Sequence, residues 1–239
     1  MLLLSEEPHL DLLSERGMRN NMWRLICLVI GYVFGLLQTG YIIGRLNGID
    51  IRSVGSKNAG TTNTLRSLGA KAGAITLIGD AFKCFFAILV CRLIFKDSLS
   101  DSILLVSLYA GLGAMLGHNF PFYLNFKGGK GIACTAGLVI SFGLIPTIIG
   151  ILVFFSTFFI THFVSLCSLV LYTVIMILTV IAGQMGVLGL EGPMLYEAYL
   201  IVLIMTIMAF VRHKENIKRL INGTERKTYI KKKGEIGEM

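Results

Sequence analysis

The chain has 239 residues and a formal net charge of +8, with 54% hydrophobic and only 15% charged residues. Soluble domains average about 45–50% apolar and about 25% charged residues, so this composition argues against a soluble core with a single anchor. The cysteines lie in apolar stretches without a C-x-x-C pair, which argues against a disulfide framework or a zinc site.

Apolar stretches long enough for membrane helices recur along the chain, at residues 25–43, 72–90, 102–116, 132–160, 164–182 and 195–211. A helix needs roughly 20 apolar residues to cross a bilayer, so we expect an all-α membrane helix bundle. The N-terminal segment mixes acidic and basic residues and does not fit a cleavable signal peptide. We expect a flexible leader at 1–21, one membrane domain at 22–225 and a basic cytoplasmic tail at 226–239.

The placement of basic residues predicts the topology. Residues 45–71 carry five Lys and Arg, and the tail from Arg212 onward carries nine. Loops rich in these residues stay in the cytoplasm. The 132–160 stretch would be about 44 Å long as one helix, against a hydrocarbon core of about 30 Å. Gly143 and Pro146 interrupt it, and a split there gives seven spans, with the N-terminus outside and the C-terminus cytoplasmic.

The first polar segment on the predicted cytoplasmic face is S-V-G-S-K-N-A-G-T-T-N at residues 53–63, followed by Arg66. Small residues let backbone N–H groups converge, and the guanidinium offers a fork for phosphate. A helix starting after Asn63 would point its positive end at the same anion. The alternative is an ordinary capped turn, which composition alone favours.

The second polar segment is F-K-G-G-K-G at residues 126–131, where two lysines flank paired glycines before a predicted membrane helix. It is not a Walker A loop, because the G-x-x-x-x-G-K-[ST] spacing fails. The alternative is a basic loop that only sets orientation, and the dense glycine–lysine kernel slightly favours an anion site.

The third polar segment is basic and occupies residues 212–225. His213 and Asn216 are three residues apart, so they share a face of a helix that leaves the membrane. A basic stripe attracted to anionic lipid is the alternative, and for this segment alone it is the better interpretation.

Charged and small residues inside the apolar stretches indicate packing. Asp80 and Lys83 stand at i, i+3 in the second stretch. Buried charges in membranes are costly and normally paired, so we expect these two to pair as a structural element. The spacings Gly31/Gly35 and Gly113/Gly117 are typical of close helix packing.

The three polar segments together resemble the PlsY family, the bacterial acyl-phosphate:glycerol-3-phosphate acyltransferases. V-G-S-K-N-A-G-T-T-N at 54–63 is similar to the family's V-G-S-G-N-x-G-A-T-N. G-H-N-F-P and F-K-G-G-K-G-I-A-C-T at 117–135 resemble its G-H-x-x-P and F-K-G-G-K-G-V-A-T. R-H-K-E-N-I-K-R-L-I-N-G-T-E at 212–225 resembles its R-H-R-E-N-I-x-R-L-L-x-G-x-E. Lys57 departs from the family's usual Gly, which bears on the conformation of the first loop.

The resemblance implies a set of functional residues at the cytoplasmic face. Catalytic roles fall to Lys127, Ser165, His213 and Asn216. Substrate binding falls to Ser56, Asn58, Thr62, Asn63, Arg66, His118, Gly128, Gly129, Lys130 and Gly131. The residues of the first segment would surround the substrate phosphates, whereas Lys127 and the 128–131 turn would hold the acyl phosphate.

The implied reaction is acyl transfer from acyl phosphate to the 1-hydroxyl of glycerol 3-phosphate, the first acylation step of phospholipid biosynthesis. The products are 1-acyl-glycerol 3-phosphate (lysophosphatidic acid) and inorganic phosphate. We expect no cofactor, no metal and no nucleic acid, but contact with membrane lipid and with a soluble enzyme that makes acyl phosphate. The implied location is the bacterial inner membrane, with the active site facing the cytoplasm.

The proton acceptor is left open by the sequence. The H-x-x-x-x-D dyad of thioester-dependent acyltransferases is absent, and either His213 or the acceptor's own phosphate could take the proton. We narrowly prefer the phosphate, with His213 donating to the substrate. A small-anion transporter is the alternative function, but it should show internal repeats and polar residues at the membrane midplane. A lipid-binding scaffold would explain the basic tail but not the glycine–lysine loop.

Overall fold

The computed structural model describes the backbone of residues 7–229 and the side chains of residues 21–229. The predicted leader and basic tail therefore fall partly outside the described residues. Helix α1 begins at Glu7, within the segment expected to be a leader, and the division into leader, membrane domain and tail stays a prediction.

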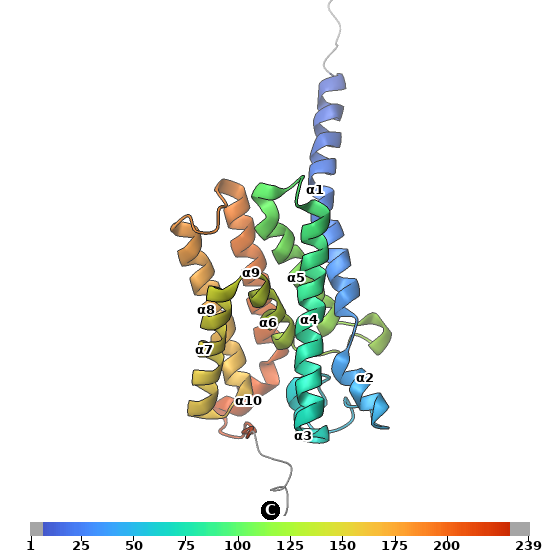
Figure 1. Ribbon diagram of the computed structural model, residues 1–239, viewed down its shortest axis with the longest axis vertical. Helices are drawn as coiled ribbons and strands as arrows, with labels where there is room; N and C mark the ends of the chain where they lie inside the picture. The colour runs from blue at the N-terminus through green and yellow to red at the C-terminus, as the bar shows by residue number, and fades with distance from the viewer. Residues whose placement is uncertain (1–6, 230–239) are drawn as a thin grey trace, which may run out of the picture.

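Every regular element among the described residues is helical (Figure 1). The α-helices are α1 (Glu7–Gly35), α2 (Thr39–Leu46), α3 (Thr61–Leu68), α4 (Ala70–Phe95), α5 (Ile103–Asn119), α6 (Ile132–Ser141), α7 (Leu144–Thr161), α8 (Val164–Gln184), α9 (Gly192–Arg212) and α10 (Lys214–Ile221). Two 3₁₀ turns, η1 (Ser100–Ser102) and η2 (Phe122–Leu124), flank α5. The predicted all-α class is confirmed for the described residues.

Six segments of the described chain are long and apolar enough to cross a membrane. The first, Asn21–Leu46, comprises α1 from Asn21 onward together with α2, and the others contain α4, α5, α7, α8 and α9. Helix α7 shows the lipid-facing character most clearly, because Leu144, Phe159 and Ile160 are 73%, 66% and 81% exposed. A helix that is apolar around its circumference is stable in hydrocarbon, where its own backbone hydrogen bonds satisfy its polar groups. The protein is therefore built as an integral membrane bundle.

The predicted break in the 132–160 stretch is present. Helix α6 ends at Ser141 and α7 begins at Leu144, with Gly143 between them at a φ of +108°. Pro146 falls in the first turn of α7, where its missing N–H removes no intrahelical hydrogen bond. Because α6 has only 10 residues, it is not among the six long helices, and the seven-span count stays a prediction.

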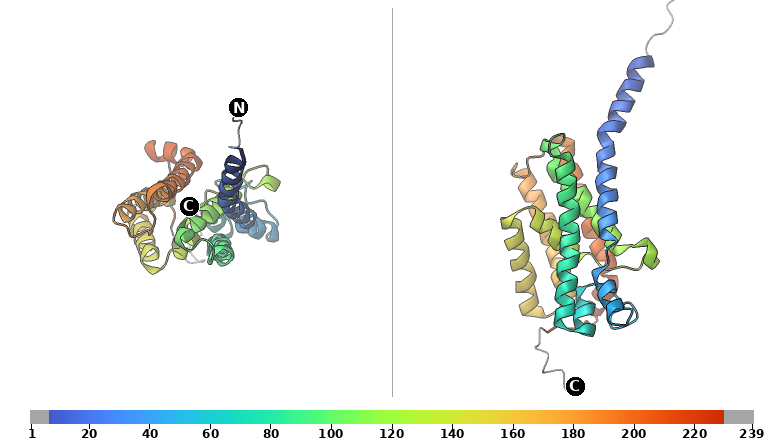
Figure 2. Two further views of the ribbon diagram at one scale, coloured as in Figure 1. Left: turned by 90° about the horizontal axis from the view of Figure 1, so that it is seen from above. Right: turned by 45° about the vertical axis from the view of Figure 1, so that its right-hand side comes forward.

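Helix α5 is the centre of the bundle, in contact with α1, α4, α6 and α9 (Figure 2). Glycines bring α1 and α5 together. A Cβ added at Gly31 would lie 2.1 Å from the Ala110 carbonyl oxygen, and one added at Gly117 would lie 2.2 Å from the Tyr32 carbonyl oxygen. The predicted packing role of the α1 and α5 glycines is confirmed, since any larger residue would force the two helices apart.

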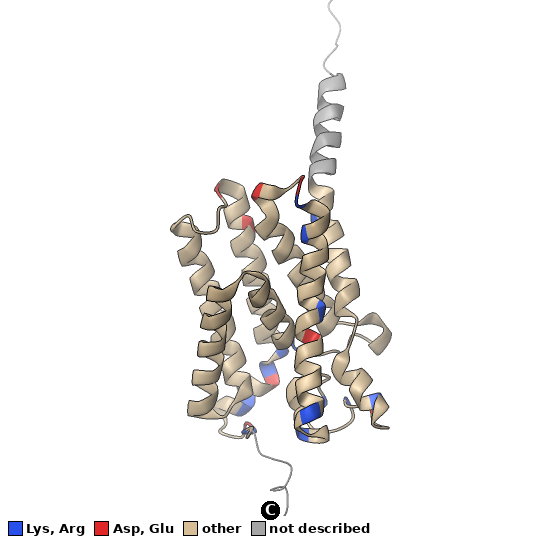
Figure 3. Cartoon of the chain, viewed as in Figure 1, with Lys and Arg blue, Asp and Glu red and all other residues tan. Residues whose placement is uncertain are grey.

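The two basic segments lie at the same end of the bundle, the end that carries α2, α3 and α10 (Figure 3). The predicted topology requires that arrangement, because both segments were assigned to the cytoplasm. At the other end, Arg24 of α1 pairs with Glu197 of α9 through hydrogen bonds of 2.5 and 2.7 Å. Helices α1 and α9 are thus held on opposite flanks of α5.

Candidate active site

A cavity of about 440 Å³ opens at the basic end, among α3, α6, α8 and α10. Most of the residues implied by the resemblance line it: Ser56, Asn58, Thr62, Asn63, Arg66, His118, Lys130, Gly131, Ser165, His213 and Asn216. The structure therefore gathers at one place residues from segments that are far apart in the sequence.

Three helices begin at this cavity. The residues of their first turns line it, namely Thr61 and Thr62 of α3, Ile132 and Ala133 of α6, and Val164 and Ser165 of α8. In the described part of the chain, none of the three receives a side-chain cap hydrogen bond at its N-terminus. The first N–H groups of a helix lack intrahelical partners and carry partial positive charge. Three uncapped N-termini around one cavity favour an anion.

The cationic side chains on the wall add to this positive potential. Arg66, Lys130, Arg219 and Arg226 all line the cavity. Nη2 of Arg66 donates to the carbonyl oxygen of Arg226 at 3.0 Å, so the segment after α10 is fastened to α3. Partial burial lowers the pKa of Lys130 to about 8. Its ammonium donates to Oδ1 of Asn216, which joins the second and third polar segments.

The first loop is organised by Asn63, which is buried at the start of α3. Its Nδ2 donates to the carbonyl oxygens of Ile51 and Val54 at 2.8 and 3.1 Å, and its Oδ1 accepts from the backbone N–H of Ser56 at 2.8 Å. These contacts shape the loop from within. Asn63 therefore holds the phosphate-suited backbone in place as well as lining the cavity.

Lys57, the departure from the family pattern, has a φ of +57°. Glycine adopts this left-handed conformation freely, whereas an L-residue costs about 1–2 kcal/mol there. The chain thus keeps the backbone geometry that a glycine would have. The substitution places a cationic side chain at the cavity.

The paired glycines have a packing role. A Cβ added at Gly128 would lie 2.0 Å from the His118 carbonyl oxygen, and one added at Gly129 would lie 1.9 Å from His118 Nε2. The carbonyl oxygens of both glycines accept hydrogen bonds from the Arg212 guanidinium. Neither glycine lines the cavity. Their absent side chains let the loop pack tightly onto His118.

Lys127 lies apart from the other expected site residues, and its catalytic role stays a prediction. Its side chain is exposed, and it is not part of the cavity wall, whereas Lys130 is. Asn125 and Phe126, just before it, both have left-handed φ values, +54° and +58°. The chain reverses there, which directs Lys130 and the start of α6 to the cavity instead.

His213 is held at the start of α10 with 3% of its surface exposed. Burial lowers its pKa to about 4, so the ring is neutral near pH 7. Its Nδ1 lies 2.8 Å from the Ala209 carbonyl oxygen, which can only accept, so Nδ1 carries the proton. The other ring nitrogen, Nε2, is therefore left as a hydrogen-bond acceptor.

Glu225, the last residue of the third segment, was not among the expected site residues, yet it lies on the cavity wall. It accepts hydrogen bonds from Ser165 Oγ at 2.9 Å, Asn216 Nδ2 at 2.6 Å and Arg219 Nε at 2.7 Å. Burial raises the pKa of Glu225, but these hydrogen bonds outweigh burial and hold it below its ordinary value. Arg226 and Thr228, also on the wall, lie outside the three segments, so no sequence signal pointed to them.

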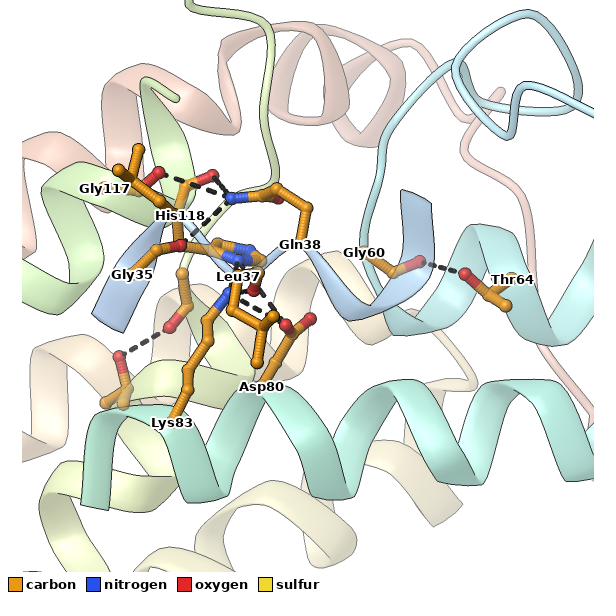
Figure 4. Close-up of polar contacts among 12 residues, drawn as sticks. Gly35, Leu37, Gln38, Gly60, Thr64, Asp80, Lys83, Gly117 and His118 are labelled. Carbon is orange, nitrogen blue, oxygen red and sulfur yellow. Dashed lines mark hydrogen bonds and ion pairs between the residues drawn. The ribbon is translucent and has the colours of Figure 1, made fainter. Parts of the chain in front are cut away.

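A buried polar network closes the floor beneath the second segment (Figure 4). Lys83 Nζ lies 2.9 Å from Asp80 Oδ1, which confirms the predicted pairing, and 2.9 Å from His118 Nδ1. Lys83 also donates to the Leu37 carbonyl oxygen at 2.5 Å. Gln38 Nε2 donates to the carbonyl oxygens of Gly117 and His118 at 3.3 and 3.1 Å. The network fixes His118, on which the glycine pair rests.

These features define a helical integral membrane protein with a cation-lined cavity at one end of its bundle. The family model described as glycerol-3-phosphate acyltransferase matches residues 25–223. The chain belongs to this family of acyltransferases, which confirms the resemblance drawn from its three polar segments. Membership also favours an enzyme over the alternative of an anion transporter.

Curated relatives and solved structures agree with that assignment. The glycerol-3-phosphate acyltransferase of Thermotoga petrophila is 38% identical over 207 residues, covering 86% of this chain and 96% of its own. That of Bacillus subtilis is 36% identical, covering 84% and 96%. The crystal structure of PlsY (YgiH), an integral membrane glycerol 3-phosphate acyltransferase, in its glycerol 3-phosphate form matches with a TM-score of 0.74 at 30% identity, covering 86% and 96%. Its lysophosphatidic acid form has a TM-score of 0.71 at 29% identity, covering 87% and 96%.

Proposed function

We propose that the protein transfers a fatty acyl group from acyl phosphate to the 1-hydroxyl of glycerol 3-phosphate. The observation that carries this proposal is the meeting of three uncapped helix N-termini with Arg66 and Lys130 in one cavity. Both substrates carry phosphate, and that surrounding suits phosphate oxygens. The solved relatives described in glycerol 3-phosphate and lysophosphatidic acid forms support the same acceptor and product.

The cavity wall also suits an acyl chain. Leu77 of α4 and Phe155 of α7 line the cavity, and they are 43% and 41% exposed. Apolar residues that are shared by a cavity and a lipid-facing surface give a fatty chain a continuous apolar path. The acyl donor therefore enters from the membrane, while its phosphate lies among the cations.

The residues of the first segment receive the acceptor. Arg66, with the backbone of the loop after Gly55 and the N-terminus of α3, binds the phosphate of glycerol 3-phosphate. Lys130 and the N-terminus of α6 bind the acyl phosphate, in the role that the sequence alone assigned to Lys127. These groups stabilise the negative charge that develops on the leaving phosphate as the acyl–oxygen bond breaks, which lowers the activation barrier of acyl transfer.

The proton leaves the acceptor hydroxyl as the new ester bond forms. His213 presents an unprotonated Nε2, so in its neutral form it accepts a hydrogen bond from the hydroxyl and aligns it for attack. With a pKa of about 4, it is too weak a base to keep the proton. A phosphate takes it up, and the products are the 1-acyl ester and hydrogen phosphate. Ser165 and Asn216 orient Glu225 beside this site.

The proposed setting is the inner membrane of a bacterium, with seven spans and the cavity facing the cytoplasm. Both basic segments lie at the cavity's end of the bundle, and cytoplasmic loops carry the excess of Lys and Arg. Glycerol 3-phosphate then reaches the cavity from the cytoplasm. A soluble enzyme that makes acyl phosphate would supply the donor on the same side, for the first acylation step of phospholipid synthesis.

The test uses the purified protein in detergent micelles with palmitoyl phosphate and glycerol 3-phosphate. Lysophosphatidic acid and inorganic phosphate should appear in equal amounts, and palmitoyl-CoA in place of palmitoyl phosphate should give no product. Equal rates with the two donors would reject acyl phosphate as the specific donor. A protein with Arg66→Ala and Lys130→Ala serves as the inactive control.

A further inference from the structure

Asp80 is a buried carboxylate on the wall of the cavity, with 1% of its surface exposed. It projects from α4, which contributes Leu77 to the same wall. Its Oδ1 lies 2.9 Å from Nζ of Lys83, with which it pairs. Figure 4 shows this contact beside His118.

The carboxylate is incompletely satisfied. Within the part of the chain that the structure describes, neither oxygen of Asp80 has a partner in hydrogen-bond geometry. Lys83 is shared with the Leu37 carbonyl oxygen and with His118, and His118 Nδ1 remains 3.8 Å from Asp80 Oδ1. Buried polar atoms are nearly always hydrogen-bonded, and an ionisable residue within a membrane marks a functional site unless its partners account for it. A donor from a ligand would complete this group.

The charges of the cavity decide what that ligand donor is. Arg66, Lys130 and the helix N-termini attract phosphate, whereas a carboxylate repels it. The other carboxylate on the wall, Glu225, already accepts from Ser165, Asn216 and Arg219. Asp80 thus suits an uncharged hydrogen-bond donor at the end of the substrate that lies away from its phosphate. In a polyol phosphate that donor is a hydroxyl.

We propose that Asp80 accepts a hydrogen bond from a hydroxyl of the polyol phosphate acceptor and thereby selects hydroxylated phosphates over alkyl phosphates. This inference rests on the proposed function and adds a second point of attachment to it. The phosphate is held by the cations, the hydroxyl by Asp80, and Lys83 keeps the carboxylate in place. A site that hydrogen-bonds a hydroxyl discriminates strongly against analogues that lack it, because its own polar group is then left buried and unpaired.

The test separates hydroxyl recognition from phosphate binding with two probes. Glycerol 3-phosphate carries hydroxyls, and propyl phosphate carries the same phosphate without them. Binding of each is measured by calorimetry on the purified full chain, for the wild type and for Asp80→Asn. The new amide presents its oxygen to Lys83, which leaves an NH₂ group where an acceptor stood. Asp101→Asn, an exposed carboxyl on η1, is the matched control.

Asp80→Asn should weaken glycerol 3-phosphate binding by about 10- to 100-fold and leave propyl phosphate binding unchanged or tighter. Unchanged binding of glycerol 3-phosphate would overturn the inference, and so would an equal loss for both probes, which indicates a structural role. A wild-type protein that binds neither probe would instead reject the proposed function.

Because Asp80→Asn leaves Lys83 without a charged partner, a second variant controls for misfolding. Asp80→Asn combined with Lys83→Met removes the pair as a unit, which is better tolerated than breaking it. It should show the same selective loss for glycerol 3-phosphate, with a thermal midpoint close to that of the wild type. If the double variant loses affinity for both probes to the same extent, Asp80 does not recognise the hydroxyl.

Discussion

Gly129 lies so close to His118 that a Cβ at this position would stand 1.9 Å from the imidazole Nε2. The imidazole cannot move away, because its Nδ1 faces Lys83 at 2.9 Å and Gln38 donates to the backbone carbonyl oxygen of His118 at 3.1 Å. Through this contact, the buried network around His118 fixes the position of the loop that carries Lys130.

We predict that Gly129→Ala displaces this loop and lowers kcat/KM on the order of 100-fold, since displacements of about 1 Å have such effects on reacting groups. Gly150→Ala is the control, because a Cβ there meets Val139 Cγ1 at an ordinary 3.5 Å. Steady-state kinetics on both variants decide the matter. Wild-type rates in Gly129→Ala would mean that the loop accommodates the added methyl group without displacing the reacting groups.

Lys130→Ala should lower the rate with acyl phosphate by about 30- to 1000-fold, the effect of losing about 2–4 kcal/mol of charge stabilisation. Lys127→Ala should leave the rate within about twofold of the wild type, because its side chain is exposed and lies off the cavity wall. The pair of variants is internally controlled, since each removes one lysine from the same loop. The reverse ranking would restore the original assignment of Lys127.

Arg66→Lys should raise the KM for glycerol 3-phosphate about tenfold or more while the KM for acyl phosphate stays near the wild-type value. Lysine keeps the charge but loses the planar fork that grips phosphate and the backbone of the segment after α10. Initial rates with each substrate varied in turn give the two constants. Equal rises in both would place Arg66 between the two phosphates.

The pH dependence of kcat/KM should report the deprotonation of Lys130. Burial gives its free-enzyme pKa a value of about 8, so the ammonium is present below that pH and is lost above it. We expect kcat/KM to fall as the pH rises through about 8. Lys130→Arg, which stays protonated, should retain activity to higher pH even if its maximum is lower. An alkaline limb that is identical in the two proteins would assign it to another group.

Cysteine labelling checks the seven-span topology. With the buried native cysteines replaced, Ser100→Cys should react with an impermeant thiol reagent added outside intact cells, and Thr224→Cys should react only after lysis. Both positions are exposed, so access is limited by the membrane alone. Labelling of both from outside would reduce the count to six crossings.

Local rules account for what the sequence determined by itself. The length of the apolar stretches fixed the helices, and Gly143 with Pro146 fixed the break between α6 and α7. Asp80 and Lys83 were paired correctly because residues at i, i+3 on one helix are neighbours wherever that helix packs. The three polar segments were recognised from their order and joint occurrence, through the family that they resemble, because composition alone favoured an ordinary turn for the first segment and a lipid-attracted stripe for the third.

Tertiary packing decided which side chains of those segments reach the cavity. Lys127 and Lys130 share one loop, and after the left-handed turn at Asn125 and Phe126 only Lys130 lies on the cavity wall. Gly128 and Gly129 read as a phosphate cradle, but contact with His118 gives them a packing role. Glu225 reaches Ser165 only because the chain after α10 folds back onto α8. Such contacts join distant segments, and local propensity holds no information about which of them pack together.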